Sequence, residues 1–417
     1  MSIGYSHSFG DRRMQRWVFN FLRITVCGIF FHWFFQWGII QCSAEDSYVN
    51  GNFVKVAVPN AVPSSPDLGV KAYVLMDADS GQIIAGKDID SKLAPASLTK
   101  IMTLYLTACA LRDGRIGLSD EVLISEKAWR AEGSRMFVQV GSRVSVEELI
   151  RGIVVASGND ATIAMAEHIA GSEEAFVDLM NLKAKELGLE DTIYADSSGS
   201  VGNSAYSTAA DQAKLVRSWL KDLPSYYSWF NDKWITYNKI KQSNRNRLLW
   251  LDSSVDGIKT GHTNEAGYCL VASAKRNQMR LISVVLGAKT DGIRVNQSIS
   301  ILNYGFRFFE THKLFDANVA LSKPRVFFGK SNNASLGLEE DLYVTVPSGQ
   351  YKSVESNIVL DDVPLRAPLS KGKSYGAIRI FLGGSLITSK PILSLVDNMR
   401  CNFIFAIFDY IRLFFSK

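Results

Sequence analysis

The chain is poor in cysteine and histidine for its length. Its 417 residues include five cysteines, none in a C-x-x-C pair, and five histidines without the short spacings of metal ligands. This argues against a disulfide framework and against a zinc site built on such spacings. We therefore expect no metal and no cofactor. Cys109 and Cys269 lie in apolar stretches and are interpreted as small buried residues.

Net charge is also low. Charged residues make up 21% of the chain and the formal net charge is +5, of which residues 1–44 carry +3. The remaining +2 is too little to favour a polyanionic partner, so we expect no nucleic-acid binding. Hydrophobic residues make up 47%, which is typical of a globular protein. The length allows two or three domains.

The longest apolar run lies near the N-terminus. A basic stretch ends at Arg23, seventeen apolar-rich residues follow over 24–40, and small residues stand at 43 and 44. This order is typical of a signal peptide, to which we assign residues 1–44. An uncleaved membrane anchor is the alternative, since such a run is marginally long enough to span a bilayer. In either case the bulk of the chain is predicted to be exported.

Changes of pattern divide the rest of the chain. Residues 45–67 contain three prolines and are predicted to be a linker. Over 68–312, stretches with the period of strands alternate with helical ones, which predicts an α/β domain with an antiparallel sheet. Over 313–393, short alternating runs joined at Gly383-Gly384 predict a small all-β sandwich.

Four elements of the α/β domain are predicted individually. They are a hairpin of residues 72–76 and 82–85, a helix from Pro95 to about Leu111, a helical stretch over 145–170, and a hairpin of Gly267–Ala274 and Met279–Gly287.

Residues 394–417 are predicted to end the chain as an amphipathic anchor helix. From Arg400 to Lys417, eight large apolar side chains fall within about 160° of arc at 100° per residue. A helix of this kind lies on a membrane surface more readily than it spans a bilayer. A terminal helix docked on the protein core is the alternative.

Three short motifs occur in order along the α/β domain. They are Ser97-Leu98-Thr99-Lys100 at a predicted helix start, Ser157-Gly158-Asn159 in a helical region, and Lys259-Thr260-Gly261 where we predict that a strand begins. Each is weak alone, because its residues are common. The ordered set resembles the S-x-x-K, S-D-N and K-T-G set of β-lactamases and penicillin-binding proteins.

The chemistry of the first motif is nucleophilic catalysis. A serine hydroxyl needs a base, and Lys100, three residues after Ser97 on a helix, lies within reach of it. Lysine can act as a base when its pKa falls, which burial and the cation Lys259 would cause. An isolated S-x-x-K would more simply be a helix cap followed by a solvated lysine.

The other motifs supply a relay and a binding edge. Ser157 can pass the proton to the leaving amine, and Asn159 can hold both Lys100 and a substrate amide. Lys259 and Thr260 can bind a carboxylate, while Gly261 allows a substrate strand to approach the backbone. A polar helix break and an exposed strand lysine are the alternatives.

With these motifs the chain resembles the D-alanyl-D-alanine carboxypeptidases, serine peptidases of the S11 type among the low-molecular-mass penicillin-binding proteins. The resemblance runs from about residue 68 to the C-terminus and includes Pro95–Lys100, Leu149–Asp160, Val255–Thr263, Gly305–Glu310 and residues 334–337. It implies an α/β penicillin-binding domain of the β-lactamase and transpeptidase kind, followed by the β-sandwich and the anchor helix.

The resemblance also implies an activity and a location. The terminal D-alanine of a peptidoglycan pentapeptide would leave through an acyl-enzyme on Ser97, and β-lactams would be covalent inhibitors. Such an enzyme takes part in cell-wall biogenesis and cell shape. It would lie at the periplasmic face of the bacterial inner membrane, held at the surface by its C-terminal helix.

Two further site residues and two departures come from the same resemblance. The backbone N–H groups of Ser97 and His262 would form the oxyanion hole, and Arg294 would bind the substrate's terminal carboxylate. Ser198-Gly199-Ser200 stands where the family commonly has His-Gly-Leu, and Ala210 replaces a usual arginine. We expect these departures to affect loop shape and substrate preference rather than acylation.

Other functions are compatible with the same motifs. A β-lactamase would need a base for deacylating water, and no Glu-x-x-Leu-Asn segment follows the second motif. A transpeptidase or an endopeptidase on the same peptides differs only in the acyl acceptor or the bond cut. A catalytically weak penicillin-binding scaffold is the remaining alternative, against which the intact Ser97, Lys100 and Lys259 argue.

Overall fold

The structure, a computed structural model, describes residues 62–200 and 204–415. The predicted signal peptide and all but the end of the predicted linker lie outside these residues.

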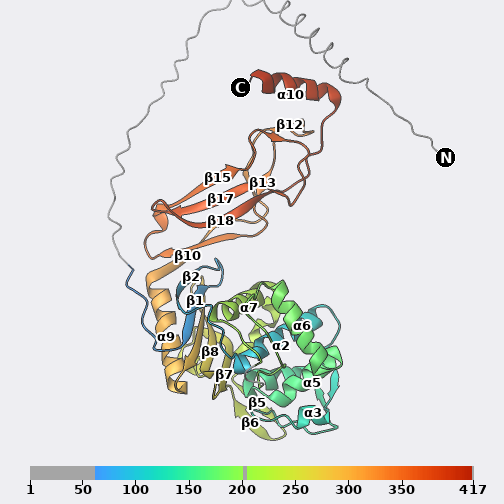
Figure 1. Ribbon diagram of the computed structural model, residues 1–417, viewed down its shortest axis with the longest axis vertical. Coiled ribbons are helices and arrows are strands. Elements are labelled where there is room, and N and C mark those ends of the chain that lie inside the picture. Colours follow the sequence, from blue (N-terminus) through green and yellow to red (C-terminus); the bar gives the residue numbers. More distant parts are fainter. Residues whose placement is uncertain (1–61, 201–203, 416–417) are drawn as a thin grey trace, which may run out of the picture. The chain divides into compact units, whose positions relative to one another are not determined.

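A five-stranded antiparallel sheet organises the first part of the described chain (Figure 1). Its strand order is β2-β1-β9-β8-β7, so β7 forms an edge. The two predicted hairpins are confirmed as the pairs β1–β2 and β8–β9. The strands are β1 (Ala72–Asp77), β2 (Ile83–Lys87), β7 (Val255–Thr263), β8 (Gly267–Arg276) and β9 (Met279–Ala288).

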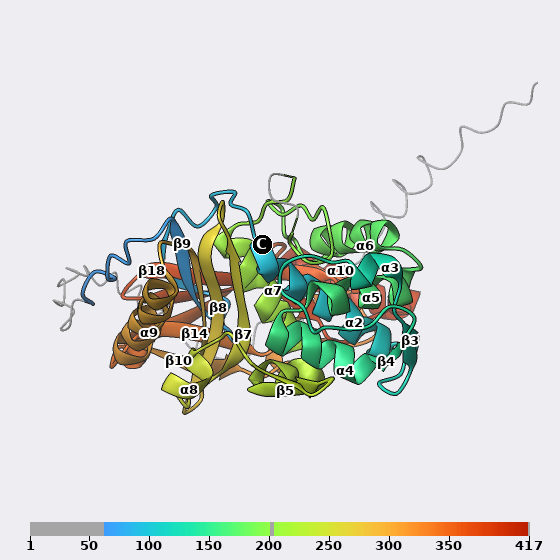
Figure 2. The ribbon, with the colours of Figure 1, turned by 90° about the horizontal axis from the view of Figure 1, so that it is seen from below.

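Helices cover both faces of this sheet (Figures 1 and 2). On one face lies α9 (Asp291–Phe308), which buries Ile301 and Leu302 against β8 and β9. The larger helical layer on the other face contains α2 (Lys100–Arg112), which is buried along its whole length from Lys100 to Ala110. A helix buried on every side belongs to the interior of a domain. Lys100, its first residue, is therefore inside the protein.

Short elements complete this part of the chain. Several helices begin at a capping side chain, as α7 does at Thr208 and α9 at Thr290. The helices are α3 (Glu126–Trp129), α4 (Val146–Arg151), α5 (Asn159–Ala170), α6 (Glu173–Glu186), α7 (Ala209–Asp222) and α8 (Leu248–Leu251), with the strand pairs β3 (Glu121–Leu123) with β4 (Arg143–Ser145) and β5 (Trp234–Tyr237) with β6 (Ile240–Ser243).

Three predicted elements differ in detail from the structure. The helix expected from Pro95 begins with a 3-10 turn at Ala96–Thr99. The pattern over 145–170 is interrupted by a π-helical turn at Gly152–Ala156, after which Ser157 adopts a left-handed conformation that no α-helix can continue. The strand carrying Lys259 begins four residues earlier, at Val255.

The second part of the chain is β-rich, as predicted. Its main sheet has the order β11-β13-β18-β17-β15, and the pair β10–β14 packs against it through Leu342, Val344 and Val346. The hairpin predicted at Gly383-Gly384 is confirmed as β17–β18. The strands are β10 (Phe309–Phe315), β11 (Ala320–Ser322), β12 (Val326–Phe327), β13 (Leu336–Gly337), β14 (Leu342–Pro347), β15 (Val354–Leu360), β16 (Leu365–Arg366), β17 (Ser374–Leu382) and β18 (Ser385–Ser394).

Partly buried hydrogen bonds join the two parts. The Thr311 hydroxyl of β10 donates to Asp77 at the end of β1 over 2.7 Å, and Ser80 and Thr345 share a hydrogen bond of 2.7 Å. Strand β10 crosses residue 312, where the sequence predicts the domain boundary. The boundaries at 312 and 393 remain predictions.

The last element is α10 (Phe403–Phe415). Its less exposed face contains Ala406, Asp409 and Leu413, spaced as one side of a helix. Asp409 is buried and accepts hydrogen bonds from the Phe328 N–H (2.6 Å) and the Arg325 guanidinium (3.0 Å). No helix within the described ranges is long and apolar enough to cross a membrane.

Candidate active site

Ser97 stands on a strained turn at the entrance to α2. The preceding residue, Ala96, has a φ of +47°, which is costly for a residue with a Cβ. Ser97 itself is half-buried, whereas Leu98 and Thr99 are buried. The turn therefore leaves the Ser97 hydroxyl as the accessible end of an otherwise buried segment.

Lys100 directs its ammonium to three oxygens from three segments. Its Nζ donates to Ser97 Oγ (3.0 Å), to Asn159 Oδ1 (2.7 Å) and to the carbonyl of Ser198 (2.7 Å). Burial lowers the pKa of Lys100 to about 7, opposed by the charges of the nearest carboxylates. Near neutral pH this amine can accept the Ser97 proton.

Asn159 is held by both ends of its amide. Its Nδ2 donates to the carbonyl of Glu132 (2.7 Å) and to Ser200 Oγ (3.0 Å), while Oδ1 accepts from Lys100. The next residue, Asp160, is buried and accepts from the N–H groups of residues 136–138. Asp160 thus keeps the loop that contains Glu132 closed over Asn159.

Ser157 and Lys259 form a second buried pair. Lys259 Nζ donates to Ser157 Oγ over 2.9 Å and to the carbonyl of Thr260 over 3.1 Å. Burial, and then the charges of Lys100, Arg245 and Arg294, lower the pKa of Lys259 well below its usual value. Three other cations thus repel the charged form of Lys259, and a bound anion would offset this repulsion.

The edge strand β7 lies against the Ser97 turn. A Cβ on Gly261 would come within 3.1 Å of the Pro95 carbonyl and 3.3 Å of the Leu98 side chain, so glycine permits this approach. Because β7 is an edge, alternate residues direct their N–H groups away from the sheet. His262, exposed and packed on the Tyr268 ring, follows Gly261 on this edge.

Arg294 lies behind that edge. The residue is 6% exposed, and its guanidinium donates to the carbonyls of Gly261 (3.0 Å) and Cys269 (3.2 Å) and forms an ion pair with Asp291 at 2.6 Å. These bonds hold the end of β7 in place. Direct binding of a substrate carboxylate by Arg294 remains a prediction.

Sequence reasoning missed two charged residues that act on this site. Arg245 is exposed and its charge lowers the pKa of both lysines, and Asp196 is a buried carboxylate whose charge raises the pKa of Lys100. Arg245 lies in a basic stretch, residues 239–247, from which a positive charge near the site could have been predicted. Nothing local distinguishes Asp196.

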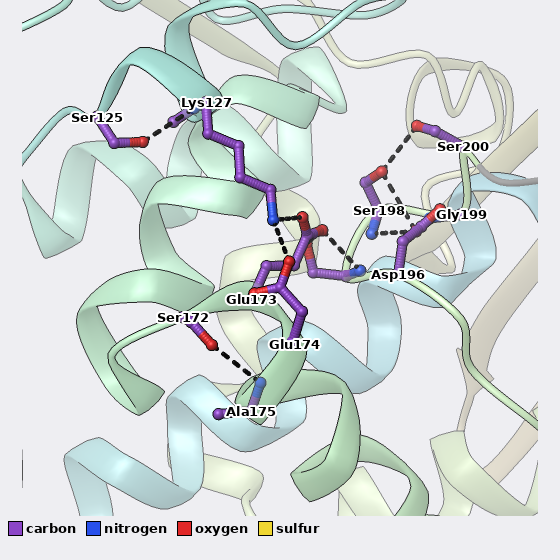
Figure 3. A network of polar contacts seen from close by, with 12 residues as sticks. Ser125, Lys127, Ser172, Glu173, Glu174, Ala175, Asp196, Ser198, Gly199 and Ser200 are labelled. Carbon is purple, nitrogen blue, oxygen red and sulfur yellow. Dashed lines mark hydrogen bonds and ion pairs between the residues drawn. The ribbon is translucent and has the colours of Figure 1, made fainter.

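The departing segment Ser198-Gly199-Ser200 is part of the site. Its first carbonyl binds Lys100, and Ser200 binds both Asn159 and the Ser198 hydroxyl (2.7 Å; Figure 3). Gly199 has a φ of +78°, and a Cβ there would lie 1.8 Å from the Ala96 carbonyl. The segment therefore contacts Lys100 and Asn159 directly. The resemblance to the family did not indicate these contacts.

Two family models match this chain. The model described as D-alanyl-D-alanine carboxypeptidase matches residues 60–290, and the model described as penicillin-binding protein 5, C-terminal domain, matches residues 309–398.

Curated relatives match over most of their length. The chain is 42% identical over 360 residues to the D-alanyl-D-alanine carboxypeptidase DacC of Escherichia coli, covering 85% of this chain and 90% of the relative. It is 38% identical over 339 residues to the carboxypeptidase DacF of Bacillus subtilis, covering 80% and 87%.

Solved structures agree in fold. Penicillin-binding protein 5 of Haemophilus influenzae has a TM-score of 0.78 and 42% identity, covering 82% of this chain and all of that one. Penicillin-binding protein D2 of Listeria monocytogenes, solved in an ampicillin-bound form, has a TM-score of 0.54 and 26% identity, covering 58% of this chain and all of that one.

We predict that Gly199→Ala slows acylation of the site. The new methyl group would collide with the Ala96 carbonyl, so the Ser198 carbonyl and the Ser97 turn must separate. A displacement of about 1 Å costs roughly 100-fold in rate. Covalent labelling by a fluorescent penicillin, followed over time, measures this.

Gly188→Ala is the matched control. Gly188 also has a positive φ, +67°, but a Cβ there would meet nothing within 4 Å. Equal labelling rates for the two variants would contradict the prediction.

Proposed function

Because this chain belongs to the D-alanyl-D-alanine carboxypeptidase family, we propose that Ser97 is its nucleophile and Lys100 the base that activates it. The protein is a serine-type hydrolase that removes the terminal D-alanine of peptidoglycan pentapeptides and takes part in cell-wall biogenesis. The observation that carries the residue assignment is the contact of a buried lysine, with a pKa of about 7, to the half-buried serine hydroxyl.

Acylation proceeds by one proton circuit. Ser97 Oγ attacks the carbonyl carbon of the penultimate D-alanine while its proton passes to Lys100 Nζ. The carbonyl oxygen, now negative, is stabilised by the backbone N–H groups of Ser97 and His262. Ser157 then relays a proton to the leaving nitrogen, and the C–N bond breaks to release D-alanine.

Deacylation restores the enzyme. Water attacks the ester carbonyl on Ser97, the base removes its proton, and the ester oxygen returns to the hydroxyl form. A β-lactam enters by the same attack, but its opened ring keeps the leaving nitrogen attached. Acylation by β-lactams therefore needs no group beyond those named for the peptide.

Recognition of the terminal carboxylate is assigned to a cationic cluster. The charge of Arg294 adds to burial in lowering the pKa of both Arg245 and Lys259. Thr260 and Gly261 follow Lys259 on the same strand, β7. A peptide that ends in a free carboxylate is attracted by the positive charges of this cluster, whereas an internal peptide bond carries no charge and is not. This favours a carboxypeptidase over an endopeptidase.

We further propose that α10 holds the exported enzyme at the periplasmic face of the inner membrane. Its docked face uses the carboxylate of Asp409, while Phe403, Phe405 and Phe408 are 80%, 66% and 57% exposed. Aromatic side chains on the outer face of a helix at the protein surface suit the lipid interface.

The first test is D-alanine release from a pentapeptide. Ser97→Ala is expected to lower release by about 10⁴-fold or more, because the acyl-enzyme cannot form without the Ser97 hydroxyl. Ser356→Ala, an exposed serine of β15, serves as the control and should retain release. Equal release by wild type and Ser97→Ala would contradict the nucleophile. A C-terminally amidated peptide should be a much poorer substrate.

The pH dependence follows from the pKa of Lys100. The amine is a base only when neutral, so the acylation rate should rise about tenfold per pH unit below pH 7 and level off above it. Stopped-flow acylation by a chromogenic cephalosporin measures this rising part of the pH–rate profile, its acid limb. His262→Gln should keep the limb in place, which excludes the nearby imidazole as its source. A flat profile between pH 6 and 8 would contradict Lys100 as base.

Membrane attachment is expected to depend on the outer aromatic residues of α10. The double change Phe405→Ser and Phe408→Ser should move the exported protein to the soluble fraction, because roughly 3–6 kcal/mol of apolar burial is lost. Leu386→Ser, which replaces a 56% exposed leucine of β18, is the control. Retention of the double variant on membranes would contradict the anchor.

A further inference from the structure

The buried carboxylate of Asp196 binds the backbone of the segment Asp196–Ser200. Asp196 accepts hydrogen bonds from the Ser198 N–H (2.7 Å), from the Gly199 N–H and, more weakly, from the Ser198 hydroxyl (3.4 Å; Figure 3). Asp196 is 9% exposed. The reaction steps proposed above assign it no role.

The geometry of a single peptide unit connects Asp196 to Lys100. The N–H of Gly199 and the C=O of Ser198 belong to one planar trans peptide and point in opposite directions. Asp196 binds the N–H end, and Lys100 Nζ binds the C=O end over 2.7 Å. The carboxylate therefore directs the carbonyl to the amine and polarises it as an acceptor.

Charge acts in the same direction. Four charged groups face Lys100: Asp196 from this segment, Asp160 from α5, Arg245 after β6 and Lys259 from β7. Burial lowers the pKa of Lys100 most, and Asp196 is the strongest of the charges that oppose it. Without Asp196 the ammonium form would lose its principal negative neighbour.

A second carboxylate holds the same segment without facing the base. Glu173 accepts hydrogen bonds from the Ser197 N–H (3.1 Å) and hydroxyl (2.6 Å). It also pairs with Lys127 at 3.0 Å, as Figure 3 shows. Its burial equals that of Asp196, at 9% exposed. Glu173 thus offers a matched comparison, since it supports the loop but contributes neither the aimed carbonyl nor a charge on Lys100.

We propose that Asp196 is the positioning residue of the general base: through the Ser198–Gly199 peptide it holds Lys100 against Ser97, and through its charge it sets the pH at which the enzyme becomes active. This rests on the proposed role of Lys100 as base. The hydrogen bonds of Asp196 to Ser198 and Gly199 place it behind the carbonyl that binds Lys100, so it acts on the site through that segment.

The test compares pH profiles of acylation by a fluorescent penicillin, from pH 5 to 9, in the full-length protein. Asp196→Asn keeps a hydrogen-bond acceptor but removes the charge. The acid limb should move to lower pH by about one unit, while the rate on the plateau falls about tenfold because the carbonyl is less well aimed. Glu173→Gln should leave the limb at its wild-type position, whatever its effect on thermal stability.

Two outcomes would overturn the proposal: an acid limb of Asp196→Asn that coincides with wild type, or one that moves equally in Glu173→Gln. Asp196→Ser also accepts a hydrogen bond without charge and should show the same shift, so the test survives a poorly folding Asn variant. The proposed function fails differently, when wild type is acylated by penicillin but releases no D-alanine from the pentapeptide.

Discussion

The burial of the Lys100 ammonium is the constraint on which the site depends. An amine removed from water is stable only when oxygens replace its hydration. Here they come from Ser97, Asn159 and Ser198, which lie on three separate segments. The same burial that requires these partners also lowers the pKa of the amine to about 7. The three hydrogen bonds of the Lys100 ammonium and its lowered pKa thus both result from its burial.

That placement is maintained by carboxylates outside the three motifs. Asp160 binds three successive N–H groups of the loop over Asn159, and Asp196 binds two N–H groups of the loop that carries Ser198. Each loop then presents one backbone carbonyl inward. A loop held by a buried carboxylate is rigid enough to direct a hydrogen bond, which a solvated loop would not be.

The C-terminal part follows a comparable division of roles. The polar side of α10 supplies Asp409 to the protein, where it satisfies the Phe328 N–H and pairs with Arg325. The apolar side is left outward. An amphipathic pattern alone does not determine which side of a helix packs against the protein. In a soluble domain the apolar side usually does so, whereas in α10 the polar side does.

The sequence by itself determined the elements and the chemistry of the motifs. Period-two runs and turn residues located the hairpins, and the ordered serine and lysine motifs predicted the acyl-enzyme site, because local patterns report local conformation and residue type. Tertiary structure alone decided the break at Ser157, the burial of Asp409, the contact of the Ser198 carbonyl with Lys100, and the bonds by which Asp196 holds that segment. The burial of Asp409 and the contact of Ser198 depend on hydrogen bonds between residues that are far apart in the sequence, and a local sequence pattern does not predict such contacts.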